Sequence, residues 1–129
     1  MTVAVAHRDS PRGDAALRAA AEEAILRGQE LAVLHIIPGA DEVDANDPAV
    51  EKEVAGKLAD VAGLTWTLHT APEEFDTAEA LLDKAEEVGA TLLVIGARHR
   101  TRVGKLLLGS TVQRVLLEST IPVLVVKAS

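Results

Sequence analysis

The sequence contains no cysteine and no tyrosine, and its only aromatic residues besides histidine are Trp66 and Phe75. Without cysteine, a disulfide framework and a thiol nucleophile are both excluded. Two aromatic rings cannot supply the successive stacking platforms on which proteins bind single-stranded nucleic acids. We therefore expect a fold held by its apolar core, with no nucleic acid as its partner.

Long apolar segments are also missing. No stretch approaches the ~20 apolar residues that are needed to span a bilayer. Residues 1–8 run directly into charged residues, unlike a signal peptide. With 129 residues the chain is long enough for one domain with a sizeable core. The expectation is a single domain over residues 1–129 that is cytoplasmic and not bound to a membrane.

Several motifs of catalysis and metal binding are absent as well. Gly104-Lys105 is followed by Leu106, so the hydroxyl residue of a Walker loop is missing, and no Gly-x-Ser-x-Gly elbow occurs. The histidines lack the i, i+4 spacing and the neighbouring cysteines of common metal sites; they are His7, His35, His69 and His99. We expect neither a metal site nor an activated nucleophile.

The chain does contain an alternation of strand-like and helix-like segments, which is typical of a parallel sheet covered by helices. Strands are predicted over residues 3–7, 31–37, 64–69, 91–95 and 121–127, and helices over 11–27, 49–61, 77–88 and 110–118. The predicted helix caps and terminators are Ser10, Gly28, Gly63, Asp76, Gly89 and Ser110. The predicted fold class is α/β, a doubly wound five-stranded parallel sheet of Rossmann-like topology.

Two further segments have a distinct composition. The first predicted helix carries a wide apolar stripe that should face the sheet, made of Ala15, Leu17, Ala20, Ala21, Ala24, Ile25 and Leu26. Residues 38–48 hold four acids without periodicity, which predicts a mobile acidic loop.

The most informative segment is the basic stretch 96–114, which follows the apolar strand at 92–95. Open α/β sheets bind ligands at the carboxyl ends of their strands, where this segment begins. Residues 88–117 contain no acid, in a chain of net charge −7, and their cations are Arg98, Arg100, Arg102, Lys105 and Arg114. A local positive field in an acidic protein favours a small anionic ligand, such as a phosphate, over nucleic acid. The alternative is a basic loop that is simply solvated.

The predicted helix after this stretch offers further donors to an anion. Ser110 is suited to cap it, with Gln113 three residues later as in a capping box. The backbone N–H groups of Ser110, Thr111 and Val112 would then point into the loop. Right-handed crossovers bring the ends of the first and fourth strands together. We therefore expect a cleft between residues 6–10 and the basic loop, with His7 beside it.

The last predicted strand, Ile121 to Lys127, is apolar on both faces, although it is expected at an edge of the sheet. An uncovered apolar edge invites pairing with another chain, and Pro122 restricts only its start. We predict a symmetric homodimer through this strand. The alternative is that a helix or the C-terminus covers it.

These residues together resemble a known family. The pattern Gly96-x2-His99-x9-Gly109-Ser110, placed between a strand and the closing helix, is similar to the nucleotide loop of the universal stress protein family, Gly-x2-Gly-x9-Gly-Ser/Thr. The similarity extends over essentially the whole chain, and residues 33–37 resemble the family's second strand. The resemblance implies one universal stress protein domain with the adenine nucleotide α hydrolase-like fold.

The family's nucleotide site can be carried over to matching positions. Loop and helix-start positions imply contacts to the phosphates of ATP, with Arg98 added for its charge: Gly96, Arg98, His99, Gly109, Ser110 and Thr111. Strand-end positions imply contacts to ribose and adenine: Ala6, Arg8, Ile36 and Ile95.

The leading hypothesis is an ATP-binding module of the stress response, with or without Mg²⁺, that acts as a homodimer. ATP hydrolysis should be slow at most, because no residue is placed to activate water. The alternative is a nucleotide-free interaction protein of the same fold. It is favoured by His99 at the family's middle glycine and by Arg8 where nucleotide-binding relatives usually carry an aspartate. A third hypothesis, an enzyme acting on another phosphorylated metabolite, lacks an identifiable general base.

Overall fold

The computed structural model describes residues 1–37, 46–73, 76–97 and 108–128. These residues form a parallel five-stranded sheet in the order β3-β2-β1-β4-β5. The strands are β1 (Thr2–Ala6), β2 (Glu30–Ile37), β3 (Trp66–Pro72), β4 (Ala90–Ala97) and β5 (Val123–Lys127). The helices are α1 (Pro11–Arg27), α2 (Pro48–Leu58), α3 (Thr77–Glu87) and α4 (Ser110–Glu118). The α/β prediction is confirmed, and so is the predicted proximity of the ends of the first and fourth strands, which pair directly.

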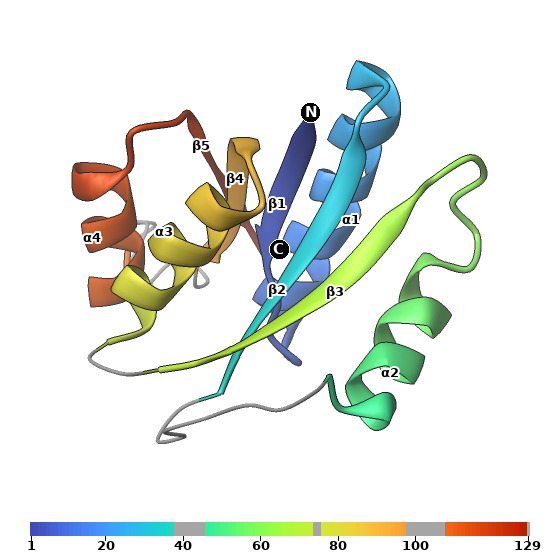
Figure 1. Cartoon of the computed structure of the whole chain (residues 1–129), viewed down its shortest axis with the longest axis horizontal. Helices are drawn as coiled ribbons and strands as arrows, with labels where there is room; N and C mark the ends of the chain where they lie inside the picture. Colours follow the sequence, from blue (N-terminus) through green and yellow to red (C-terminus); the bar gives the residue numbers. More distant parts are fainter. Residues whose placement is uncertain (38–45, 74–75, 98–107, 129) are drawn as a thin grey trace.

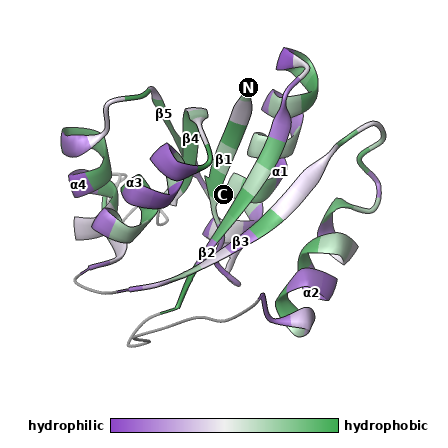
Figure 2. Ribbon diagram, in the orientation of Figure 1, coloured by the Kyte–Doolittle hydropathy of each residue, from purple (hydrophilic) through white to green (hydrophobic). Residues whose placement is uncertain are grey.

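The helices cover both faces of the sheet, α1 and α2 on one and α3 and α4 on the other (Figure 1). Successive residues of a strand point to opposite faces. Accordingly Val3 and Val5 pack with α1, whereas Ala4 packs with α3 and α4. In the hydropathy colouring the inner strands are largely hydrophobic and the helices carry their hydrophilic residues outward (Figure 2). Two apolar cores therefore fix the sheet between its helix layers.

The first helix begins and ends where the sequence predicts. The hydroxyl of Ser10 accepts a hydrogen bond from Gly13 N at 3.1 Å, Pro11 is the first helical residue, and Gly28 adopts a left-handed φ of 64° after the last turn. The predicted stripe is wrong at Ile25 and Leu26, which are 43% and 81% exposed. The buried face follows Leu17, Ala20, Ala21 and Ala24, and a helix of 3.6 residues per turn carries residues 25 and 26 past that face.

Two predicted boundaries between the second helix and the third strand are also wrong. The helix α2 ends at Leu58, and Gly63, at φ 78°, lies in the turn that follows. The strand β3 begins at Trp66 and continues to Pro72, because it pairs with β2 as far as Ile37. Apolar periodicity marks an element better than its ends. The predicted acidic loop lies outside the described residues, apart from its last three.

The last two helices differ in how they begin. Asp76 caps α3 by accepting a hydrogen bond from Glu79 N at 2.8 Å, and Gly89 follows the helix with φ 70°, as predicted. Ser110, in contrast, is not a cap. Gly109 holds that position, and Ser110 is the first helical residue, since Gln113 N already donates to Gly109 O at 3.1 Å. The Gln113 side chain donates to Leu108 O instead of completing a capping box.

The strand β5 lies at the edge of the sheet, as the sequence predicts, and pairs with β4. It begins at Val123 and not at the predicted Ile121, because its pairing with β4 starts there. None of the described helices has both the length and the apolar character to cross a bilayer. The sheet order places the ends of β1 and β4 side by side, and the site described next lies there.

Candidate functional site

A cavity of about 250 Å³ opens at the carboxyl ends of β1, β2 and β4, next to the N-termini of α1, α3 and α4. Such a position, where the strand order reverses, is the usual ligand site of doubly wound sheets. The lining residues come from all of these elements: Ala6, His7, Arg8, Arg12, Gly13, Ile36, Thr77, Leu81, Ile95, Gly96, Gly109, Ser110, Thr111 and Val112.

Most of the predicted site residues line this one cavity. Eight of the ten belong to the described part of the chain, and all eight are among the lining residues: Ala6, Arg8, Ile36, Ile95, Gly96, Gly109, Ser110 and Thr111. The other two, Arg98 and His99, lie outside the described residues. Positions from four separate stretches of sequence are therefore neighbours in the fold.

The start of α4 provides the donors expected of an anion site. The first hydrogen bond of this helix is made by Gln113 N, so the amides of Ser110, Thr111 and Val112 have no acceptor within the helix. All three residues line the cavity. Their N–H groups, with the positive end of the helix dipole, can hold a phosphate or carboxylate.

Gly96 and Gly109 lie in the same cavity for different physical reasons. A β carbon on Gly96 would lie 2.2 Å from Arg12 O, so only glycine lets the start of α1 pack over the end of β4. Gly109 has an ordinary φ of −68°, and no described atom lies within 4 Å of the place where its β carbon would be. The described fold therefore gives no steric reason for glycine at 109, although a ligand approaching the backbone would.

Positive charge dominates the described lining of the cavity. Two arginines, Arg8 and Arg12, line it, and no aspartate or glutamate does so within the described ranges. A second cavity, of about 590 Å³, lies between α3 and α4. It is lined by four acidic residues and one arginine, which are Glu79, Asp83, Glu86, Glu118 and Arg114. An anionic ligand is favoured in the first cavity and disfavoured in the second.

Arg114 does not serve the cavity, contrary to its inclusion in the predicted basic field. Its guanidinium donates to the carboxylates of Asp76 and Glu118 and so ties α4 to the start of α3. The pKa of Asp76 is held below its usual value by the hydrogen bond from Glu79 N and then by Arg114. The other predicted cations of the basic stretch, Arg98, Arg100, Arg102 and Lys105, lie outside the described residues.

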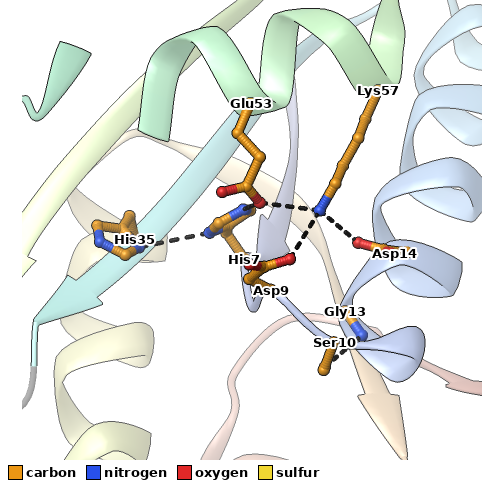
Figure 3. Close-up of polar contacts among 8 residues, drawn as sticks. All are labelled: His7, Asp9, Ser10, Gly13, Asp14, His35, Glu53 and Lys57. Carbon is orange, nitrogen blue, oxygen red and sulfur yellow. Dashed lines mark hydrogen bonds and ion pairs between the residues drawn. The ribbon is translucent and has the colours of Figure 1, made fainter. Parts of the chain in front are cut away.

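His7 lines the cavity, but its imidazole is directed to the α2 side of the sheet, where its side chain is only 3% exposed. Its Nδ1 atom lies 3.4 Å from Nδ1 of His35, and its Nε2 atom lies 3.4 Å from Glu53 Oε1 without hydrogen-bond geometry (Figure 3). Burial, and next the charge of His7, lower the pKa of His35. Because the ring faces away from the cavity, it is not placed as a base for a ligand there.

Glu53 also belongs to an ion-pair cluster centred on Lys57 of α2. The Lys57 ammonium lies 2.6 Å from Asp14, 2.8 Å from Glu53 and 3.3 Å from Asp9 (Figure 3). Although desolvation lowers the pKa of Lys57, hydrogen bonds to these three carboxylates raise it above its usual value. The cluster fastens the loop between β1 and α1, which forms one wall of the cavity, to α2.

The sequence prediction missed several lining residues, of which Arg12, Gly13 and Thr77 show why. Arg12 and Thr77 lie in the first turns of helices whose N-termini reach the cavity, and only the packing of those helices reveals them. Gly13 did carry a signal, because glycine inside a helix costs about 1 kcal/mol and so indicates a packing constraint. A β carbon added at Gly13 would lie 1.8 Å from Arg8 O. No group of three or more metal-binding side chains occurs among the described residues.

The whole chain, and not only this cavity, matches a known family. A model of the universal stress protein family aligns with residues 1–127. The chain belongs to the universal stress protein family. A universal stress protein of Mycolicibacterium smegmatis is 40% identical over 127 residues, covering 97% of this chain and 96% of that protein.

Solved structures of this family share the fold. A universal stress protein from Archaeoglobus fulgidus is 33% identical, covers 98% of both chains and superposes with a TM-score of 0.78. A structure of the universal stress protein from the same organism in complex with dAMP is 30% identical over 98% of both chains, with a TM-score of 0.73. The predicted adenine nucleotide α hydrolase-like fold is thereby confirmed.

Proposed function

We propose that this universal stress protein binds an adenine nucleotide, in the first place ATP, in the cavity at the ends of β1 and β4. The observation that carries the proposal is the start of α4, where three amides without a helical acceptor line a cavity whose described charged residues are all basic. A triphosphate is the anion that such a site suits. The complex of an A. fulgidus relative with dAMP supports the choice of an adenine nucleotide.

In the proposed complex the phosphates lie against the amides of Ser110, Thr111 and Val112, close to Gly96 and Gly109. Arg98 and His99 are proposed as additional phosphate contacts, with Mg²⁺ accompanying ATP. The apolar end of the cavity, at Ile36, takes the base, and Ile95 lies below the sugar. This orientation matches negative charge to the helix dipole and the base to apolar side chains.

We propose a regulatory role in the stress response and not an enzymatic one. Among the described lining residues there is no carboxylate, and the imidazole of His7 is turned toward Glu53. A water molecule beside the phosphates therefore meets no described general base, and any ATP hydrolysis should be slow. The proposal retains the cytoplasmic location expected from the sequence.

Calorimetric titration of the purified protein with ATP, ADP and AMP, each with and without Mg²⁺, tests the binding. We expect saturable heat with all three nucleotides, strongest for ATP. Mass analysis of nucleotide released from the purified protein is an independent measurement. Absence of heat at millimolar nucleotide would contradict the proposal and favour a nucleotide-free interaction protein.

Substitution of Gly109 tests the location of the site. Gly109→Val should weaken ATP binding about tenfold or more, because the valine side chain would enter the space proposed for the phosphates. A tenfold loss of affinity corresponds to about 1.4 kcal/mol of binding free energy. The matched control is Gly56→Val, since Gly56 of α2 also has open space around its missing β carbon and lies outside the cavity. Unchanged ATP affinity in the Gly109 variant would reject this site.

We also propose that the protein forms a homodimer through the edge made by residues 121–127. The support is a set of exposed apolar side chains near this edge: Leu124 of β5 is 36% exposed, and Leu116 and Leu117 of the neighbouring helix α4 are more so. An open strand edge beside apolar side chains is suited to pairing with a second copy.

Light scattering of two lysine variants tests the dimer. Leu124→Lys should shift the protein toward a monomer, whereas the control Leu26→Lys, at an exposed leucine of α1, should not. Leu124 is preferred to Val125 because Val125 packs against a core and its loss would disturb folding. A Leu124→Lys variant that remains dimeric would place the interface elsewhere.

A further inference from the structure

The strand order determines which part of a nucleotide lies over which strand. The donors of α4 and Ile95 are on the β4 side of the cavity, Ile36 is at the end of β2, and β1 runs between β2 and β4. A nucleotide whose phosphate binds α4 and whose base binds at Ile36 must cross the end of β1. Its ribose therefore lies beside the residues that follow β1, which are His7 and Arg8.

The groups at the end of β1 are unusual partners for ribose hydroxyls. A hydroxyl that donates needs an acceptor, and a guanidinium has five donors and no acceptor. The acids nearest to Arg8 in sequence, Asp9 and Asp14, are held by Lys57 at 3.3 and 2.6 Å (Figure 3), and neither is among the described lining residues. The carboxylates are thus directed to α2, while Arg8 remains at the cavity.

An arginine at this position matches an anion better than a hydroxyl. Dinucleotide-binding sites show the same chemistry, since an acid there binds a free ribose hydroxyl and an arginine accommodates a ribose phosphate. Guanidinium groups bind phosphate oxygens in a bidentate manner. Arg12, on the first turn of α1, adds positive potential at the same cavity.

We infer that Arg8 selects nucleotides that carry a second phosphate on the 2′ or 3′ position of the ribose. The ligand class is then an adenine nucleotide with a 2′- or 3′-phosphate, whose simplest form is an adenosine bisphosphate with its 5′-phosphate on the amides of α4 and the other phosphate on Arg8. The inference rests on the proposed nucleotide binding and adds a specificity-determining residue to it.

Calorimetric titration with AMP, adenosine 3′,5′-bisphosphate and adenosine 2′,5′-bisphosphate tests the inference. One of the two bisphosphates should bind the wild-type protein about tenfold more tightly than AMP, as expected for one additional charge-assisted pair. In Arg8→Gln the ratio of bisphosphate to AMP affinity should fall to about twofold or less, whatever the variant does to the affinity for AMP itself. Arg8 is exposed, so the variant should fold, and the fluorescence of Trp66 verifies this.

The matched control is Arg18→Gln, which removes the same charge from an exposed arginine of α1 that pairs with Asp60 at 3.1 Å. It should leave the ratio of bisphosphate to AMP affinity unchanged. Equal binding of AMP and both bisphosphates to the wild type would overturn the inference and leave the proposed function intact. An Arg8→Gln variant that loses AMP and bisphosphate affinity by the same factor would also overturn it. Absence of binding by all three ligands would overturn both proposals.

Discussion

At the scale of single residues, the described glycines differ in the constraint that acts on them. Gly13 and Gly96 allow one segment of main chain to approach another closely. A β carbon added at Gly13 would lie only 1.8 Å from Arg8 O, and one added at Gly96 only 2.2 Å from Arg12 O. Gly28, Gly63 and Gly89 supply left-handed turns. Gly56 has neither constraint, because it is helical and surrounded by open space. The residue type predicts a constraint, but only the neighbours show which constraint it is.

Alanine at Gly96 and at Gly56 should change stability in opposite directions. Gly96→Ala should lower the free energy of unfolding by about 2 kcal/mol or more, because the backbone of α1 must move away. Gly56→Ala should raise it by about 1 kcal/mol, since alanine is the better helix former. Urea unfolding followed by the fluorescence of Trp66, which packs against the core, measures both. A Gly96→Ala variant as stable as the wild type would contradict the close contact.

Two partly buried histidines, His35 and His69, should make stability depend on pH near neutrality. Desolvation lowers the pKa of His35 and of His69 below the value of 6.5 that both have when unfolded, with further lowering by His7 and by Lys84. In the window between the folded and unfolded pKa values the unfolded chain binds more protons, so stability falls as the pH drops below 6.5.

We therefore expect the urea midpoint to decrease between about pH 7.5 and about pH 5.5. The double variant His35→Gln, His69→Gln should show a smaller decrease, because glutamine does not titrate. Titration of the histidine ring protons by NMR gives the folded pKa values directly. An equal decrease in the wild type and in the double variant would assign the pH dependence to other groups.

At the scale of elements, the starts of α1 and α4 show how similar sequences produce different helix N-termini. A serine stands near each start, but Ser10 caps its helix and Ser110 is already inside the helix. In α1 the serine satisfies an amide of the first turn. In α4 the corresponding amides have no such partner, and they are the ones that line the cavity. The missing cap of α4 is consistent with a bound anion taking its place.

Alanine at these two serines should separate a stabilising role from a ligand-binding one. Ser10→Ala should lower the free energy of unfolding by about 1 kcal/mol, the usual cost of a lost cap. Ser110→Ala should change it by less than about 0.5 kcal/mol, because its hydroxyl makes no cap bond. Urea unfolding without nucleotide measures both. Equal destabilisation by the two substitutions would show that Ser110 caps α4 after all.

At the scale of the whole molecule, Lys57 connects parts that are far apart in sequence. One ammonium contacts carboxylates from the loop after β1, from α1 and from α2, and so fixes the outer wall of the cavity against the α1 and α2 layer. The cluster also leaves the described lining of the cavity without acids. In a chain of net charge −7, this sorting of charge creates a basic site.

Loss of the lysine should weaken the fold in a way that depends on salt. Lys57→Met should lower the free energy of unfolding by about 1 kcal/mol at low ionic strength and by less in concentrated NaCl, as expected for a partly exposed network. Arg18→Met, which breaks an exposed single pair with Asp60, is the control and should have a smaller effect. Urea unfolding at two NaCl concentrations measures this difference. If the effect of Lys57→Met were independent of salt, lost packing of its stem would be the explanation.

The sequence by itself determined the architecture and predicted most of the residues that line the candidate cavity. The alternation of apolar strands and capped helices predicts a parallel doubly wound sheet, and the right-handedness of its crossovers brings the ends of the first and fourth strands together. The spacing of Gly96, Gly109 and Ser110 resembles one family closely enough to assign further residues, and all of those that the structure describes meet at one cavity. Local rules were sufficient here because caps, turns and periodicity act within a few residues.

Only the tertiary structure decided how the polar groups are distributed. Arg114 pairs with Asp76, Asp9 and Asp14 pair with Lys57, and the imidazole of His7 turns toward Glu53. Each of these outcomes depends on a partner from another element. The attraction between two charges depends on their separation, so the sequence alone does not show which pairs will form before packing brings them within a few ångströms. For the same reason the exposure of Leu26 and the close contact at Gly96 became visible only once the helices lay on the sheet.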